Sequence, residues 1–302
     1  MGGKFALLIG NGFTIDFLKY NNSILSSSLP LRKFGSSNIE YSDFLNSMPS
    51  IDKDLIQKTG NDFDLIKIFS EKYKIDSIEF NHLRQFLSLA YSKLHFSISD
   101  YEYDNWKWNN WLHKNRHNLL CSISLNYDLL LETTLSNLNI KHFRVGTDEL
   151  AQGSMLLKPH GSIDFDMPNH AISMPKEMRL SGTTFLNDAQ YVHVLNHDEL
   201  LYPRIEADII PPTMYNFQKK LSWVENQFKA YQYISTKIDK FVLIGVSYWS
   251  VDRPEIDFFL EHLPKNATVY IGNKDPSPDL IKKLFQLHLK HYTFDFHELP
   301  WD

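Results

Sequence analysis

The chain has 302 residues, of which 43% are hydrophobic and 22% charged, an ordinary globular composition. Its formal net charge of −5 argues against a protein whose main task is to neutralise nucleic-acid phosphates, so we do not expect nucleic acid as a direct partner. The single cysteine, Cys121, excludes a disulfide within the chain and a zinc site built from cysteines.

The first predicted element is a buried strand over 4–10, KFALLIG. This apolar run is too short to span a membrane and no signal-cleavage pattern follows it, so we expect a cytoplasmic protein without a membrane partner. A predicted helix comes after the next four residues, Gly10, Asn11, Gly12 and Phe13. The two glycines suit either a plain turn with positive φ or the approach of a phosphate to the helix N-terminus. Ile15 stands where the dinucleotide fingerprint has its third glycine, so this motif alone does not decide.

Residues 20–118 contain helical patterns, such as 80–96, and no convincing core strand. We interpret them as a helical insertion within a single domain that spans 1–302. Three tryptophans at 104–118 lie among basic and amide residues, a combination that can stack on nucleic-acid bases. Trp108 and Trp111 are three residues apart, as on one buried helical face, and we favour a place in the core or in a subunit interface.

Further short apolar runs predict core strands at 119–128, 155–161, 240–247 and 267–275, and an alternating run predicts an edge strand at 291–299. Helical patterns follow three of these strands, at 129–138, 254–262 and 278–288, and another at 217–238 precedes the strand at 240–247. Apolar strands that alternate with helices indicate a parallel sheet covered on both faces. The expected fold is therefore a doubly wound, Rossmann-like α/β sheet with a helical insertion.

Small or polar residues stand where these strands end: Asn126 and Asp128, then His160, then Gly245 and Ser247, then Asn273. In a doubly wound sheet such strand ends converge on one crevice, where ligands bind. Each residue also has a purely structural explanation. Asn126 and Asp128 fit helix capping, and a lone histidine is often a hydrogen-bonded structural residue. Only their convergence indicates a site.

One segment offers a different chemistry. The run 193–200, HVLNHDEL, brings together His193, His197, Asp198 and Glu199. His193 and His197 have the i, i+4 spacing that places two metal ligands on one face of a helix, as in metal-dependent hydrolases. The surrounding region, 163–215, is rich in Pro, Asn, Asp and His and predicts loops, so we expect no metal.

As a set and in this order, GNGF, SLNYD, KPHGSID, FVLIGVSYWSVDRPEID and ATVYIGNKDPS resemble the sirtuin-like (SIR2-like) NAD-consuming domain of bacterial antiphage defence systems. The resemblance covers 5–16 and 119–275, includes the loop ADIIPPTMYNF at 207–217, and leaves the helical insertion unmatched. The opening LLIGNGFTIDF with the later EYSDFL is also similar to AbiH-type abortive-infection proteins.

The resemblance implies a sirtuin-type fold and an NAD+ hydrolase that releases nicotinamide and ADP-ribose as a toxic effector of abortive infection. Asn126 would hold the nicotinamide ribose and a water, and His160 would act as the catalytic base. Asp128 would order the nicotinamide pocket, while Asp16 is only a loose match. The remaining implied contacts are to the pyrophosphate and ribose for Gly10, Asn11, Gly12 and Phe13, to phosphate or ribose for Gly245 and Ser247, and to the adenosine ribose for Asn273.

One departure from the family pattern and one alternative function accompany this expectation. Sirtuin deacetylases carry a four-cysteine zinc module, and one cysteine cannot form it, which argues against deacetylation of protein lysines. A non-catalytic NAD or ADP-ribose sensor would use the same glycines and asparagines without needing His160. Because an unrestrained NAD+ hydrolase would harm its own cell, we expect control by homo-oligomerisation or by a separate partner protein. The trigger, the choice between NAD and NADP, and a linear or cyclic product stay open.

Overall fold

The computed structural model describes residues 3–23, 46, 48–60, 62–74, 77–166, 190–201, 207–212, 221–273, 275–295 and 298–301. Its central sheet has seven strands, all parallel to their neighbours. In spatial order these are β3 (His142–Arg144), β4 (Ser154–Leu157), β2 (Leu119–Ser124), β1 (Phe5–Ile9), β7 (Lys240–Ile244), β8 (Thr268–Gly272) and β9 (Lys290–Phe294). The strand order reverses between β1 and β7, and this confirms the predicted doubly wound sheet.

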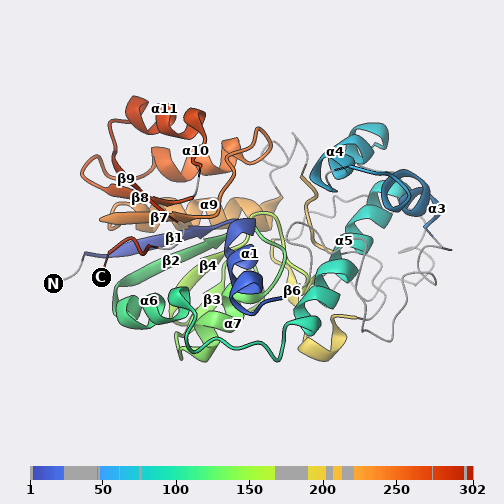
Figure 1. Ribbon diagram of the computed structural model, residues 1–302, viewed down its shortest axis with the longest axis horizontal. Coiled ribbons are helices and arrows are strands. Elements are labelled where there is room, and N and C mark those ends of the chain that lie inside the picture. The colour runs from blue at the N-terminus through green and yellow to red at the C-terminus, as the bar shows by residue number, and fades with distance from the viewer. Residues whose placement is uncertain are drawn as a thin grey trace.

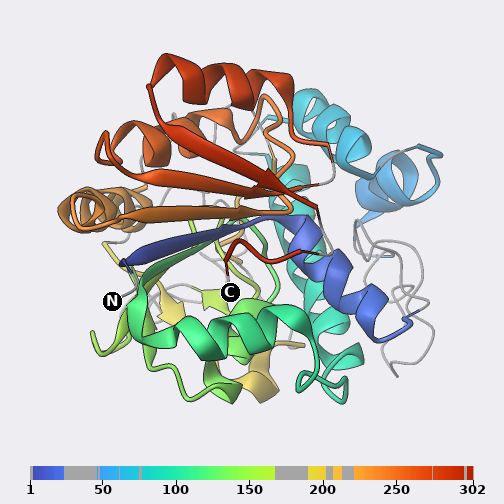
Figure 2. The ribbon, with the colours of Figure 1, turned by 60° about the vertical axis from the view of Figure 1, so that its left-hand side comes forward.

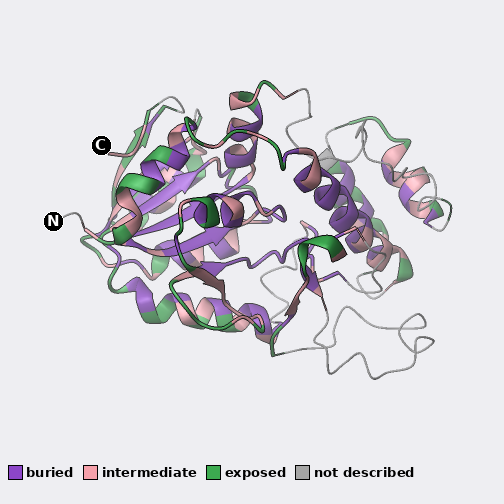
Figure 3. Ribbon diagram, turned by 90° about the horizontal axis from the view of Figure 1, so that it is seen from below, coloured by how far each residue is buried: buried purple, intermediate pink, exposed green. Residues whose placement is uncertain are grey.

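The central strands β1, β2 and β7 are largely apolar and buried because helices cover both faces of the sheet (Figure 3). On one face lie α1 (Asn11–Tyr20), α6 (Lys107–Asn115) and α7 (Leu130–Asn137), and on the other α9 (Ser222–Ser235), α10 (Arg253–Glu261) and α11 (Pro278–Gln286) (Figure 2). Side chains alternate along β1, so that Phe5, Leu7 and Ile9 pack into the first layer while Ala6 and Leu8 pack into the second.

In the part that the structure describes, the insertion between α1 and β2 consists of helices joined by turns and loops and contains no strand. It contains α3 (Pro49–Ile51), the π-helical turn η1 (Asp52–Ile56), α4 (Asp62–Lys72), α5 (Ile78–Ser97) and α6, followed by the 3₁₀ turn η2 (Arg116–Asn118). Ser77 caps α5 by accepting a hydrogen bond from the Phe80 N–H at 3.2 Å. Helices α3, α4 and α5 lie beyond the carboxyl ends of the strands, to the right of the sheet in Figure 1.

The tryptophans of the insertion lie in the core. Trp106, Trp108 and Trp111 are at most 1% exposed, and the Trp111 ring contacts that of Phe5 at 5.2 Å. This burial confirms that the tryptophans belong to the core. The alternative interpretation, in which the rings stack on nucleic-acid bases, is wrong.

Among the described residues, three short elements escaped prediction: β3, and the antiparallel pair of β5 (Phe165–Asp166) and β6 (His193–Val194). These strands have two or three residues, and none forms an apolar run. The predicted edge strand was correct, because β9 closes one side of the sheet. Within the described ranges, no helix has the length and apolarity needed to cross a membrane.

Candidate active site

A cavity of about 850 Å³ opens at the carboxyl ends of the strands, next to the reversal between β1 and β7. Its size lies within the range of roughly 300–1,000 Å³ that is usual for small-molecule sites. Of the ten residues that the sequence predicts for the site, eight line this cavity: Gly10, Asn11, Gly12, Asn126, His160, Gly245, Ser247 and Asn273. Phe13 and Asp128 do not line it.

Backbone packing explains the glycines at the base of the cavity. The Gly10 and Gly12 N–H groups donate to the carbonyls of Ile244 and Gly245 at 2.9 and 3.1 Å, so the turn after β1 lies directly on the turn after β7. A Cβ on Gly12 would lie 2.5 Å from the Gly245 Cα. Gly245 has φ +61°, whereas Gly10 and Gly12 do not have the positive φ expected of a plain turn. The Gly12 N–H, already bonded, is not an open donor for a phosphate.

Phe13 faces the core instead of the cavity. Its ring is fully buried and lies 4.8 Å from the ring of Trp106, which does line the cavity. The indole N–H of Trp106 donates to Asp16 at 2.8 Å, and the Lys107 ammonium lies 3.5 Å from the same carboxylate. Phe13 therefore supports the cavity wall indirectly, by packing against Trp106. Asp16, which matches the family's acid only loosely, is itself part of that wall.

Asn126 is held by hydrogen bonds that leave one atom for a ligand. Its amide nitrogen donates to the Gly10 carbonyl and to the Thr14 hydroxyl oxygen, both at 3.1 Å. The Thr14 hydroxyl in turn donates to Asp128 at 2.8 Å. Since both amide hydrogens of Asn126 are used, its side-chain oxygen is the atom that can accept a hydrogen bond from a ligand. Asp128 thus contacts the cavity only indirectly, through Thr14 and Asn126. Thr14, which joins the two residues, was not predicted from the sequence.

His160 lies in the loop that follows β4, with one ring nitrogen fixed by the backbone. Nδ1 lies 3.2 Å from the carbonyl oxygen of Leu125, which can only accept, so Nδ1 carries a hydrogen. In the neutral ring the lone pair is then on Nε2. The side chain is buried, and Nε2 makes no hydrogen bond to any residue that the structure describes. His160 can therefore accept a proton at Nε2.

Two acidic residues outside the predicted site face this nitrogen. Nε2 lies 3.9 Å from Asp252 Oδ1 and 3.9 Å from Glu255 Oε1. Burial raises the pKa of Asp252, and it raises the pKa of Glu255 to about 7. A signal for both was present in the sequence. The two acids are three residues apart at the predicted start of the helix that follows a polar strand end, so they share one helix face.

The loop that carries His160 is anchored on both sides. The Lys158 N–H donates to the Gln227 side chain at 2.7 Å. The His160 carbonyl accepts from the Ile210 N–H at 2.9 Å. Gly161 has φ +79°, and a Cβ there would lie 1.8 Å from the Asp208 carbonyl oxygen, so only glycine fits. These contacts fix the position of the imidazole.

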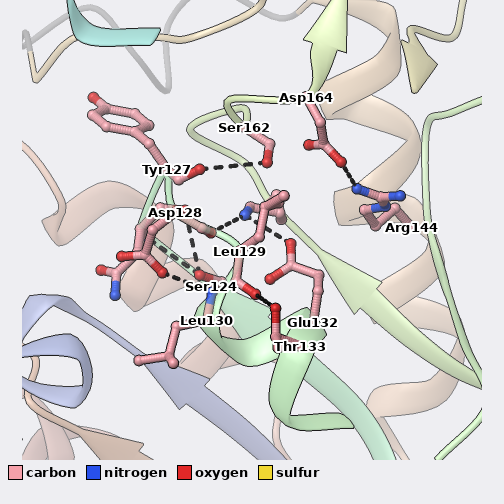
Figure 4. Close-up of polar contacts among 12 residues, drawn as sticks. Ser124, Tyr127, Asp128, Leu129, Leu130, Glu132, Thr133, Arg144, Ser162 and Asp164 are labelled. Carbon is pink, nitrogen blue, oxygen red and sulfur yellow. Dashed lines mark hydrogen bonds and ion pairs between the residues drawn. The ribbon is translucent and has the colours of Figure 1, made fainter. Parts of the chain in front are cut away.

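A buried polar cluster lies beneath the site (Figure 4). The fully buried Lys158 ammonium donates to Glu132 at 2.8 Å and to the Asp128 carbonyl at 2.7 Å, which ties β4 to α7. Nearby, Arg144 pairs with Asp164, as the dashed line in Figure 4 shows. The ion pair with Arg144 lowers the pKa of Asp164, although burial alone would raise it.

The helical insertion supplies part of the cavity wall. Tyr91 of α5 lines it and contacts the Tyr127 ring at 5.3 Å, and Tyr127 donates to the Ile210 carbonyl at 2.6 Å. Arg84, also on α5, donates to the Ile209 carbonyl at 3.1 Å. Helix α5 is thereby bonded to the 207–210 segment that holds the His160 loop.

The alternative metal site lacks the helix that it requires. His193 lies in β6, where its Nδ1 is 2.5 Å from Asp148 Oδ2, and His197 lies in the 3₁₀ turn η4 (His197–Glu199) with its ring 4.5 Å from that of Phe96. Their i, i+4 spacing therefore does not place them on one helix face. Among the residues described, no group of three or more His, Cys, Asp or Glu side chains is placed to hold a metal ion.

No protein-family model matches the chain, and no curated protein matches it. Two solved structures are similar to it over most of its length. A mutant Sir2 homologue in complex with ADP ribose has 11% identity and a TM-score of 0.41, covering 95% of this chain and 85% of that one. Sir2 with a p53 peptide and NAD+ has 12% identity and a TM-score of 0.36, covering 98% and 90%. Likeness at this level carries no information on activity.

Proposed function

We propose that the chain binds NAD+ in the cavity and hydrolyses the bond between nicotinamide and ribose, releasing nicotinamide and ADP-ribose. The observation that supports this best is the convergence of Asn126 and His160 on one cavity wall. The first offers a fixed hydrogen-bond acceptor, and the second offers a ring nitrogen that can take a proton. The sequence resemblance to sirtuin-like NAD-consuming domains selects NAD+ as the ligand.

The residues match what this reaction requires. Cleavage builds positive charge on the ribose, as in glycoside hydrolysis. Nicotinamide leaves NAD+ as a neutral molecule, so no general acid is needed. The Asn126 oxygen would hold a ribose hydroxyl or the attacking water over the anomeric carbon, while His160 Nε2 would accept the proton. General base catalysis of this kind contributes about 10²–10⁴-fold.

The rest of NAD+ would lie along the loops after β1, β7 and β8. Gly10, Asn11, Gly12, Gly245 and Ser247 would lie beside the pyrophosphate and its riboses. The sequence resemblance assigns Asn273 to the adenosine ribose. Its amide nitrogen donates to the Val246 carbonyl at 2.9 Å, so its oxygen would face the ligand. Phe13 and Asp128 would act indirectly, through Trp106 and through Thr14.

The test is HPLC of purified protein with NAD+, alongside Asn126→Ala and His160→Ala variants. We expect the wild type to release nicotinamide and ADP-ribose and each variant to lose at least about 100-fold in turnover. Calorimetric titration should show that the His160→Ala variant still binds NAD+. Tight binding without turnover in the wild type would instead favour the non-catalytic sensor.

We also propose that this activity serves as a toxic effector in antiphage abortive infection and is restrained by homo-oligomerisation or a partner protein. The sequence resemblance supports the defence role, and the toxicity of uncontrolled NAD+ loss supports the restraint. Specific activity should then change with protein concentration or on adding a partner. Constant specific activity over a wide concentration range, with no partner present, would contradict the restraint.

A further inference from the structure

Asp252 and Glu255 stand in an unusual relation to His160. Asp252 occupies the N-cap position of α10, where an aspartate normally accepts a hydrogen bond from the first turn, yet its side chain makes no cap bond. Its Oδ1 lies 3.9 Å from His160 Nε2 instead. Glu255, three residues on, places Oε1 at 3.9 Å from the same nitrogen. Two carboxyl groups thus face one imidazole nitrogen.

Two buried atoms in this cluster lack the partners that buried polar atoms usually have. His160 Nε2 and Glu255 Oε2 both make no hydrogen bond within the described parts of the chain. Such atoms are rare in folded proteins, because a buried polar atom without a partner loses the hydrogen bonds that it would make with water. The attraction of acids to a helix N-terminus accounts for their place in the first turn, but not for a carboxyl group buried against an unpaired imidazole.

The two acids differ in their access to solvent. The Asp252 side chain is 22% exposed and lines the cavity, whereas that of Glu255 is 2% exposed and lies behind it. Burial raises the pKa of both groups, and His160 opposes this rise. Three titratable groups from other elements near the loop have partners of their own. Tyr127 bonds to the Ile210 carbonyl, Asp208 pairs with Arg84, and Lys158 pairs with Glu132.

Hydrolysis of NAD+ needs a place for one proton. The attacking water forms a C–O bond to the anomeric carbon, nicotinamide leaves with the electron pair of the C–N bond, and one water proton is released. If His160 Nε2 takes this proton, a positive charge appears on a buried ring, which is costly without a negative partner.

We propose that Asp252 and Glu255 form one proton-holding unit with His160. Asp252 stabilises the His160 imidazolium and passes the imidazolium proton to the cavity. Glu255, which does not line the cavity, sets the total negative charge of the two carboxyl groups that face the ring. This inference rests on the proposed function. Asp252 and Glu255 are positioning residues, since both act through the His160 ring.

The test uses Asp252→Asn and Glu255→Gln, with Glu261→Gln as the matched control on the same helix. Glu261 is 48% exposed and pairs with Lys283, away from His160. NMR of the histidine rings gives the pH midpoint at which His160 titrates, and a His160→Gln spectrum identifies its signal among the thirteen histidines. Kinetics with NAD+ give kcat, KM and their pH profiles.

We expect the His160 midpoint to fall by at least about half a pH unit in Asp252→Asn, because the imidazolium loses a nearby negative charge. Glu255→Gln should lower the midpoint less, and the control should leave it unchanged. The kcat of Asp252→Asn should fall about 10–100-fold at a nearly constant KM. The acidic limb of the kcat/KM profile should move to lower pH, as the midpoint does.

If the His160 midpoint is unchanged in both variants, the proposed proton-holding unit is wrong, even if the wild type hydrolyses NAD+. If the midpoint moves as expected but the wild type releases no nicotinamide, the unit stands and the proposed reaction fails. The NMR readout therefore separates the two claims.

Discussion

At the scale of single residues, Thr14 decides whether Asn126 presents its oxygen or its nitrogen to the cavity. Its hydroxyl donates to Asp128 and accepts from Asn126, so it sets the direction of the whole chain of hydrogen bonds. Replacing Thr14 with Val keeps the volume but removes this link. We expect Thr14→Val to lower kcat for NAD+ about 10–100-fold, whereas Thr14→Ser retains activity. Equal kcat in the two variants would contradict this role.

A second prediction follows from the protonation of Glu255 and concerns only the stability of the folded chain. Burial raises its pKa from the 4.5 usual for a glutamate to about 7. Its contribution to stability is thus fully present below about pH 4.5 and is lost as the pH rises through about 7. Glu255→Gln should match the wild type near pH 4.5 and be more stable at pH 8, by about 3 kcal/mol at most. Urea unfolding at both pH values checks this, and a difference independent of pH would refute it.

At the scale of elements, the buried pair of Lys158 and Glu132 ties β4 to α7 beneath the site. Lys158→Met leaves Glu132 buried and unpaired, which should cost about 3–5 kcal/mol of unfolding free energy. Changing Glu132→Leu in the same chain removes the uncompensated charge and should restore much of that loss. Urea unfolding of the single and double variants measures the coupling. A double variant no more stable than Lys158→Met would count against the pair.

The elements also show which parts of the fold and of the site can be predicted from the sequence. The long apolar strands and amphipathic helices were predictable, because burial on both faces leaves a continuous pattern. β3 and the antiparallel pair of β5 and β6 were not, since each has only two or three residues, apolar and polar mixed, and pairing with a neighbouring strand makes them strands. Strand ends placed Asn126 and His160 in one crevice. Thr14 and Glu255 escaped, because their roles depend on which way a helical side chain turns toward another segment.

At the scale of the whole molecule, binding of NAD+ to the folded state should stabilise the chain. A ligand at a hundred times its Kd adds about 2.7 kcal/mol, which for a chain of this size raises Tm by roughly 4 °C. Because Gly12 lies on the Gly245 backbone, Gly12→Ala should lower the basal Tm. Wild-type Tm that does not respond to NAD+ would contradict binding in the cavity.

The central claim is that Asn126 and His160 act as a unit on one bound NAD+. A double-mutant cycle of Asn126→Ala and His160→Ala, measured as nicotinamide released per enzyme by HPLC, tests it most directly. Residues that act as a unit are strongly non-additive, so we predict that the double variant loses little more than either single variant. Losses that multiply in full, or turnover by His160→Ala close to that of the wild type, would contradict the claim.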